Sequence, residues 1–228
     1  MEANADSCAA VEGLLKSRHS CRAFLPDAVP RRVIERIAAI AQLTPSWCNT
    51  QPWQLAITVG DETQRFRQAL LEQAAREEGR PDFDFPAEYT GIYRERRRRC
   101  GWQLYDSVGI ERGDREASSA QAARNFRFFG APHVAIISTP GELGVYGAVD
   151  CGAYVNNFML AAQSMGVATI AMASSALHAR FVRSYLDIEE GRLLVCGIAF
   201  GYEDVGHPAN GFRTERADPG QVIRWFGE

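Results

Sequence analysis

The chain has 228 residues, of which 46% are hydrophobic and 23% are charged, and its formal net charge at pH 7 is −3. This composition is typical of a folded globular domain, and the charge does not favour general binding to nucleic acid or to anionic membranes. No apolar run approaches the roughly 18 residues that a membrane span requires, and the first residues lack the pattern of a signal peptide. We therefore expect a cytoplasmic protein.

The first part of the chain predicts three helices and one strand. Asp6 or Ser7 can cap a helix that ends near Arg18, and Pro30 opens a second helical segment with apolar residues on one face. The run QLAITV at residues 54–59 predicts a strand. A third helix follows, for which the stretch DETQ offers a cap.

Residues 79–130 predict an excursion or lid inserted into the domain. Its first part, GRPDFDFPAEYT, has neither helical nor strand periodicity, and we expect its aromatic residues Phe83, Phe85 and Tyr89 to be buried. Helical stretches are expected near residues 90–107 and 115–129.

The second part of the chain predicts two interior strands, at residues 133–139 and 192–202, because both are continuous apolar runs. Residues 150–166 predict the most apolar helix, which Gly166 ends. Few strands, many helices and no strict alternation favour an α+β fold. We expect a single domain over residues 1–228.

The cysteines do not predict a metal site. They form neither a C-x-x-C pair nor a cluster with histidine at zinc-ligand spacing. Free thiols in a reducing compartment are the simplest interpretation. The six residues are Cys8, Cys21, Cys48, Cys100, Cys151 and Cys196.

Residues 17–24, SRHSCRAF, gather hydrogen-bond donors where the first helix ends. Arginine offers a fork of N–H groups that matches phosphate, and Ser20 adds a hydroxyl group. An anion site is therefore one interpretation. The other is a solvated helix end, where cations balance the helix dipole, and the local sequence by itself favours that second interpretation.

Two further segments carry polar residues that could bind a ligand. The loop TPSWCNTQPW at residues 44–53 can hold several hydrogen-bonding groups at fixed positions, or it can be an ordinary turn with a tryptophan in the core. Arg213 and Arg216 in the tail would matter if they pair with Arg18, and otherwise they belong to a charged loop.

The run RERRRRC at residues 94–100 is the remaining charged feature. A helix spreads such arginines around its surface, so a solvated helix or a rim that attracts anionic substrates is favoured over a nucleic-acid-binding module. The chain contains no dinucleotide, phosphate-loop or nucleophile-elbow motif. His178 and His207 are isolated, and we expect surface or capping roles for them.

Three segments taken together resemble the FMN-dependent nitroreductase family. RHSCRAF resembles its R-[RH]-S-x-[RK]-x-[FY] motif, and PSWCNTQPW resembles its P-S-x-x-N-x-Q-P-W loop. CGIAFGY and then HPANGFRTERA resemble its G-x-x-x-G-Y strand and N-x-x-R-x-x-R tail. The motifs span nearly the whole chain in order, and residues 81–110 resemble the branch that includes the nitrobenzoate reductases.

The resemblance implies a nitroreductase-like α+β fold with a central, mainly antiparallel sheet flanked by helices. It also implies an intertwined homodimer with two FMN molecules at the subunit interface. Arg18, His19 and Ser20 would hold the phosphate and ribityl part of FMN, and Arg22 would lie near the flavin pyrimidine edge. The full set of expected cofactor-binding residues is Arg18, His19, Ser20, Arg22, Pro45, Ser46, Trp47, Asn49, Gln51, Met172, Ala173, Arg213 and Arg216.

The same resemblance assigns roles to the polar loop and to the stretch GVATIAMASSA. Ser46, Trp47 and Asn49 would reach FMN from the partner subunit. Backbone amides at Met172 and Ala173 would face flavin N5. Trp47 stands where the family has a small residue, and Ala171 and Met172 stand where this branch commonly has Pro and Gln. These departures bear on substrate preference.

The implied activity is ping-pong reduction of a nitroaromatic compound, such as one like nitrobenzoate, or of a quinone, with NAD(P)H as electron donor. Because the flavin carries the difficult chemistry, no dedicated protein acid or base is expected, and Arg22 would tune the flavin. The alternative within the fold is reductive dehalogenation, or another reduction of a phenolic substrate. Nucleic acid and membranes are not expected partners.

Overall fold

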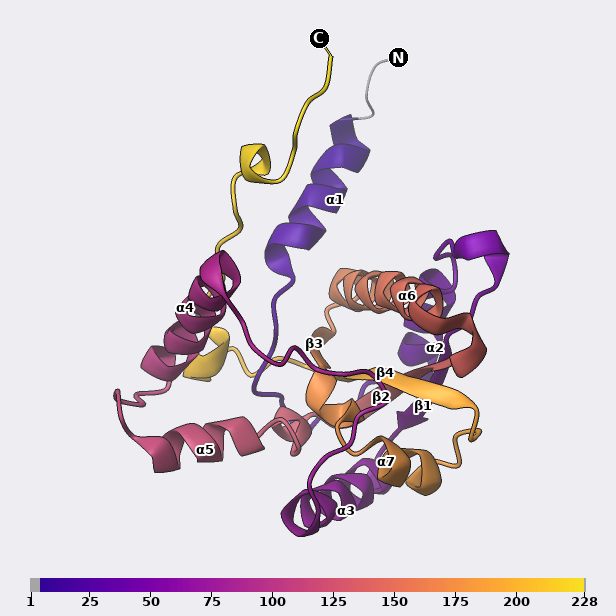
Figure 1. Ribbon diagram of the computed structural model, residues 1–228, viewed down its shortest axis with the longest axis vertical. Helices are drawn as coiled ribbons and strands as arrows, with labels where there is room; N and C mark the ends of the chain where they lie inside the picture. The colour runs from indigo at the N-terminus through magenta and orange to yellow at the C-terminus, as the bar shows by residue number, and fades with distance from the viewer. Residues whose placement is uncertain (1–4, 228) are drawn as a thin grey trace.

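The computed structural model describes residues 5–227 (Figure 1). Its centre is a four-stranded sheet with the order β1–β2–β4–β3, in which every neighbouring pair is antiparallel. The strands are β1 (Gln54–Thr58), β2 (His133–Pro140), β3 (Ala168–Met172) and β4 (Arg192–Gly201). The helices are α1 (Ala5–Ser17), α2 (Arg31–Ala41), α3 (Asp61–Arg76), α4 (Gly91–Ser107), α5 (Arg115–Ala123), α6 (Gly144–Ser164) and α7 (Ala179–Tyr185).

The sheet is covered by helices on both faces, as Figure 1 shows. Side chains of a strand alternate between the two faces, and β2 follows this rule. Ala135 and Ile137 pack in the core that contains α2 and α6, whereas Val134 and Ile136 pack in the core that contains α3 and α7. Burial on both faces explains the apolar run at the centre of β2, and the predicted α+β fold is confirmed.

Helices α1, α4 and α5 and the C-terminal tail lie to one side of the sheet and its covering helices (Figure 1). α4 has no buried residue, and α1 and the tail expose large apolar side chains such as Val11, Leu15 and Trp225. In the described part of the chain, no helix is long and apolar enough to cross a membrane.

Several local predictions need correction. β3 and α7 were not expected, because β3 has only five residues, two of them alanines of weak strand propensity. The N-cap of α3 is Gly60, which makes no side-chain cap. α6 begins at Gly144, before the predicted start at residue 150. Its first turns carry exposed apolar residues, and these hide the helical pattern in the sequence.

The start of the excursion differs from the prediction in its aromatic residues. Phe85 is 44% exposed and Tyr89 is 41% exposed, and the ring of Tyr89 contacts the guanidinium group of Arg97 at 5.1 Å. The excursion is anchored by Asp82 instead, which accepts hydrogen bonds from both Nη atoms of Arg183 and from the backbone of β4. The assignment of one domain with an inserted excursion stays a prediction.

Candidate functional site

The segment after α1 lies along the free edge of β3. Ser20 forms a bridge with Thr169, and the backbone N–H of Cys21 donates to the carbonyl oxygen of Thr169 at 3.0 Å. Cys21 is completely buried, and burial raises the pKa of its thiol to about 12. The thiol therefore stays protonated, and Cys21 is a packing residue that fixes the segment to the sheet.

Asn210, from the tail, fastens the same segment on its other side. Its Oδ1 atom accepts from the backbone N–H of Arg22 at 2.7 Å. Its Nδ2 atom donates to the carbonyl oxygens of Ala23 and Asp204, both at 2.9 Å. The Asn210 side chain is 3% exposed, so these bonds tie the beginning and the end of the chain together in a dry environment.

A cleft of about 730 Å³ opens between α1, the segment after it, α4, α6 and the tail. The cleft is lined by Glu12, Leu15, Lys16, Arg18, His19, Ser20, Arg22, Cys100, Asn156, Phe212, Arg213, Thr214 and Arg216. Thus six predicted cofactor-binding residues, from both ends of the sequence, meet in one place. Among residues 5–227, no carboxylate forms an ion pair with any of the four arginines.

The arginines of the cleft carry uncompensated positive charge. Burial lowers the pKa of Arg18, and the nearby positive charge of Arg216 lowers it further. Burial also lowers the pKa of Arg22, whose guanidinium group lies 5.6 Å from the centre of the Phe212 ring and donates to the carbonyl oxygen of Ser20. Partly buried cations that lie together without counter-charges raise the free energy of the folded protein, and a bound anionic ligand would lower it again.

The sequence did not single out two residues that hold this site. His19 Nε2 lies 2.9 Å from Glu203 Oε1, and this contact fixes the ring at the edge of the cleft. Asn210 belongs to the tail motif N-x-x-R-x-x-R, but only the arginines of that motif were assigned a role. Glu203 follows the strand β4 directly, and no local signal marks it.

The polar loop of residues 44–53 lies apart from this cleft. The backbone N–H of Trp47 donates to the Asp150 carboxylate, and Asn157 donates to Thr44 Oγ1 at 2.8 Å. Asp150 and Asn157 are seven residues apart and share one face of α6, whereas Asn156 lines the cleft from a neighbouring face. Pro45, Ser46, Trp47, Asn49 and Gln51 are therefore not brought to Arg18 within one chain.

The polar loop is held in a strained and specific shape. Cys48, Asn49 and Gln51 have φ values of 49°, 58° and 47°, a region that residues other than glycine rarely adopt. Ser46 Oγ accepts from the backbone N–H of Gln51 at 2.9 Å. The exposed ring of Trp47 packs edge-on against Tyr146, with 4.3 Å between ring centres. A strained backbone that several contacts hold in place is often found in a functional loop.

Met172 and Ala173 lie at the end of β3 and also outside the cleft. Met172 is buried, whereas Ala173 is exposed and begins a short helical turn that packs on β4. This close packing needs Gly197, because a Cβ atom there would lie 2.7 Å from Ser175. Thr169 contacts Ser20, and Met172 is three residues, or about 10 Å, further along the strand.

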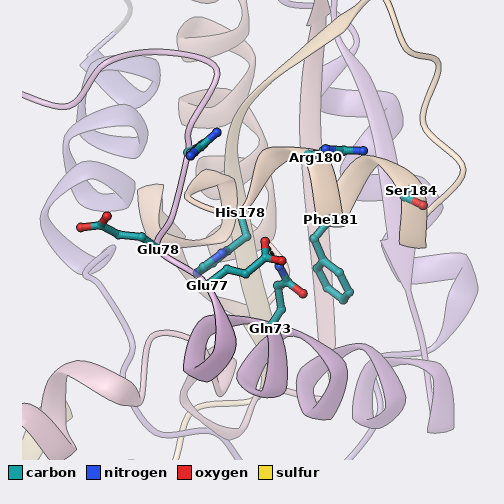
Figure 2. A pocket seen from close by; sticks show the side chains of 8 residues that line it. Gln73, Glu77, Glu78, His178, Arg180, Phe181 and Ser184 are labelled. Carbon is teal, nitrogen blue, oxygen red and sulfur yellow. Dashed lines mark hydrogen bonds between the residues drawn. The ribbon is translucent and has the colours of Figure 1, made fainter.

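A second cavity, of about 690 Å³, lies between α3 and α7 (Figure 2). Figure 2 shows the Glu77 side chain beside His178, with its carboxylate turned toward Gln73, whose Nε2 atom donates to it at 2.8 Å. Two glutamates line it, so it suits a phosphate less well than the first cleft does. His178 is 6% exposed and not a surface residue, whereas His207 accepts from the backbone N–H of Ala209, as expected for a cap.

Metal ligation has no support in residues 5–227, where no three His, Cys, Asp or Glu side chains form a group that could hold an ion.

Comparison with known proteins identifies the family of this chain. The sequence profile described as the Nitroreductase family matches residues 15–202. This chain belongs to the nitroreductase family. Within the family it is 35% identical to nitroreductase NfnB of Mycolicibacterium smegmatis, over 96% of this chain and 94% of that protein. It is 32% identical to 4-nitrobenzoate reductase of Pseudomonas putida, over 90% of each chain.

The fold of this nitroreductase matches solved structures closely. The crystal structure of the FMN-dependent nitroreductase NfnB from Mycobacterium smegmatis in complex with NADPH superposes with a TM-score of 0.92, at 34% identity, and covers 96% of this chain and 99% of that one. The resemblance to the nitroreductase family, including the branch with nitrobenzoate reductases, is therefore confirmed, as is the nitroreductase-like fold.

Proposed function

We propose that this nitroreductase binds FMN in the cleft lined by Arg18 and Arg216 and uses it to reduce nitroaromatic compounds with NAD(P)H. The observation that carries the proposal is the group of four arginines without counter-ions, contributed by both ends of the chain. A phosphate dianion fits this donor set, since guanidinium groups bind phosphate through paired hydrogen bonds. The similar protein NfnB of Mycobacterium smegmatis is described as an FMN-dependent nitroreductase, and its structure holds NADPH.

Each part of the cleft has a distinct task in this proposal. Arg18 and Arg216 bind the phosphate, with His19, Ser20 and Arg213 beside them. Bound FMN supplies two-electron transfer between the nicotinamide and the aromatic acceptor. The half-buried guanidinium group of Arg22 holds positive charge beside the cofactor ring, where water screens it less than at the surface, and it thereby stabilises electron density on the ring.

We further propose a homodimer in which the polar loop of one subunit, with Pro45, Ser46, Trp47, Asn49 and Gln51, completes the cofactor site of the other. This arrangement is supported by the distance of the loop from its own cleft and by its strained, exposed shape. It is also supported by the exposed apolar side chains of α1 and the tail, which a second subunit would cover. Met172 and Ala173 complete the proposed site through their backbone amides.

The proposed acceptor is an aromatic compound with a negative charge, such as a nitrobenzoate. A groove between α4 and the tail meets the cofactor cleft, since Cys100, Thr214 and Arg216 line both. Arg96 lines this groove and has no carboxylate partner in the described part of the chain, whereas Arg99 pairs with Glu215. Quinones are further candidate acceptors, and a cytoplasmic location goes with the proposal.

Steady-state oxidation of NADH and NADPH by the FMN-loaded protein tests this function. A panel of nitroarenes, quinones and halophenols should show turnover with the first two classes. Turnover with halophenols alone would favour the dehalogenase alternative. A colourless protein that does not bind added FMN would contradict the proposal.

A further inference from the structure

A third cleft, of about 600 Å³, lies between α3, α5 and the turn that follows α5. It is lined by Arg67, Ala117, Ala120, Gln121, Arg124, Arg127, Phe129 and Gly130, and it shares none of these residues with the cofactor cleft. Three of its eight lining residues are arginines, and none is an aspartate or a glutamate. A cavity of this size can hold a phosphate together with the group that carries it.

Arg67 brings an uncompensated charge to this cleft from α3. Its Nη2 atom donates to the carbonyl oxygen of Ala131 at 2.6 Å, and its Nη1 atom donates to the side-chain amide of Gln64. Its Nε atom is buried and has no partner among the residues described. Burial lowers the pKa of Arg67, and no carboxylate offsets this effect. The guanidinium group is thus held in place by neutral acceptors only.

Arg124 is poorly paired as well. Its Nη2 atom lies 3.4 Å from the carbonyl oxygen of Arg22, and its Nη1 atom lies 3.4 Å from His207 Nε2. Because His207 Nδ1 accepts from the backbone N–H of Ala209, a neutral ring carries its proton on Nε2 and offers Arg124 no lone pair. Arg127 is exposed, and no ion pair within residues 5–227 involves it.

Gln121 supplies a second and independent observation. Its side chain is only 7% exposed, and its Nε2 atom is buried without a hydrogen-bond partner in the described chain. Native proteins rarely leave a buried amide unpaired, because the lost hydrogen bonds cost free energy. An acceptor that enters the cleft would satisfy this donor and the arginines together.

The arginines are not needed to cap α5. The last carbonyl groups of this helix already accept backbone hydrogen bonds, from Arg124 to Gln121 at 3.3 Å, from Asn125 to Ala122 at 3.1 Å and from Phe126 to Ala123 at 3.1 Å. Balancing of the helix dipole therefore explains at most part of the cluster.

We propose that Arg67, Arg124, Arg127 and Gln121 form a second anion site, which binds a phosphate-type dianion outside the cofactor cleft. Through Arg124, this site touches the backbone of Arg22, so its occupant sits against the segment that lines the cofactor cleft. Two sources share the required chemistry, namely a free phosphate or pyrophosphate ion and the phosphate of NADPH.

Calorimetric titration of pyrophosphate into the FMN-loaded protein tests the site, because FMN then fills the first cleft. A potassium chloride titration of equal ionic strength is the control for screening. We expect saturable binding at one site per chain, weakened about tenfold by Arg127→Gln and unchanged by Arg36→Gln, which removes an exposed arginine of α2. The side chain of Arg127 makes no hydrogen bond in the described chain, so its replacement should not disturb folding.

Gln121→Leu is the second variant, since it removes the unpaired amide while keeping the charges, and it should also weaken binding. The two sources are distinguished by the KM values for NADPH and NADH. A KM that rises about tenfold for NADPH alone in Arg127→Gln identifies the dinucleotide phosphate. Unchanged KM values with weakened pyrophosphate binding identify a free anion. Absence of saturable binding, or equal binding by Arg127→Gln and Arg36→Gln, would overturn the site. If the protein does not retain FMN, the proposed function fails, and the same titration with an Arg18→Ala background still tests the second site.

Discussion

Arg18 and Arg216 lie close enough for the charge of one to lower the pKa of the other, although they stand near opposite ends of the sequence. Their mutual repulsion destabilises the fold when no anion is bound, whereas in the proposed FMN complex the same two charges would stabilise the bound phosphate. A single substitution should therefore have opposite effects on the apo-protein and on cofactor binding.

Arg216→Gln should weaken FMN binding by about 1.5–3 kcal/mol, because it removes a charge-assisted hydrogen bond to the phosphate. The same variant should leave the apo-protein as stable as the wild type or slightly more stable. Fluorescence titration with FMN and thermal unfolding of the apo-protein measure the two effects. Arg36→Gln, which removes an exposed arginine elsewhere, should change neither. Unaltered FMN affinity in Arg216→Gln would place the phosphate elsewhere.

Arg22→Gln should lower the reduction potential of the bound flavin. The buried cation favours the more negative, reduced state of the ring, and a loss of about 1.5–3 kcal/mol corresponds to about 30–60 mV for two electrons. Arg22→Lys keeps the charge, and its reduction potential should lie between those of the wild type and Arg22→Gln. Equilibration with a reference dye gives the potentials, and a potential that stays constant or rises in Arg22→Gln would argue against this role.

Arg96→Gln should raise the KM for 4-nitrobenzoate several-fold and leave the KM for uncharged nitrobenzene unchanged. The reason is that Arg96 lines the groove beside the cofactor cleft without a carboxylate partner in the described chain. Arg98→Gln is the matched control, because it removes an exposed arginine of the same helix that does not line the groove. Equal effects of both variants would indicate general electrostatic attraction only.

Asn210→Ala should destabilise the apo-protein by about 3 kcal/mol, since it leaves the backbone groups of Arg22, Ala23 and Asp204 unpaired in a buried place. For a chain of this length we expect a fall in Tm of about 6–12 °C. Asn210→Asp keeps the acceptor for Arg22 but turns a charged oxygen toward the carbonyl oxygens of Ala23 and Asp204, so it should show at least as large a fall. If Asn210→Ala unfolds at the wild-type temperature, the three hydrogen bonds of Asn210 do not stabilise the fold.

Stability should decline in alkaline solution because of the two buried thiols of Cys21 and Cys151 and the half-buried thiol of Cys196. Burial raises the pKa of Cys21 and Cys196 to about 12 and that of Cys151 to about 11, from an ordinary value of 9.0. A folded-state pKa above the unfolded one gives stability that is fully present below pH 9 and is lost as the pH rises through the folded value. Above pH 9, each thiol should lower the free energy of unfolding by about 1 kcal/mol per pH unit.

Urea unfolding under reducing conditions at pH 8, 9 and 10 measures this slope, and Cys196→Ala should make it shallower. An identical slope in the variant would mean that the thiol titrates no differently in the folded protein.

The sequence predicted the elements in which the pattern of apolar residues matches the faces that are buried. β2 and β4 are continuous apolar runs because both sheet faces are covered, and α2 has a clear apolar stripe. β3 was missed because a short edge strand depends on its partner β4 for its stability. Phe85 and Tyr89 were predicted to be buried from their hydrophobicity, but each can remain exposed in an excursion that Asp82 anchors.

The site shows the same division. Local sequence favoured a solvated helix end at Arg18, and only the resemblance joined it to Arg216, because no local pattern reports a contact between the two ends of a chain. Asn210 and Glu203 act through hydrogen bonds to residues far away in the sequence, and such bonds leave no periodic pattern.

The hydrogen bonds of Asn210 also mean that the cleft is completed late in the synthesis of the chain. All four strands are complete once Gly201 has been made, yet Asn210, Arg213 and Arg216 are still to come. Ribosomes add roughly 5–20 residues per second, so the last residue of the sheet is synthesised about a second or more before the last arginine of the cleft. FMN should therefore join a nascent chain late, after its core has formed, and cofactor supply should limit the yield of active enzyme more than the yield of folded protein.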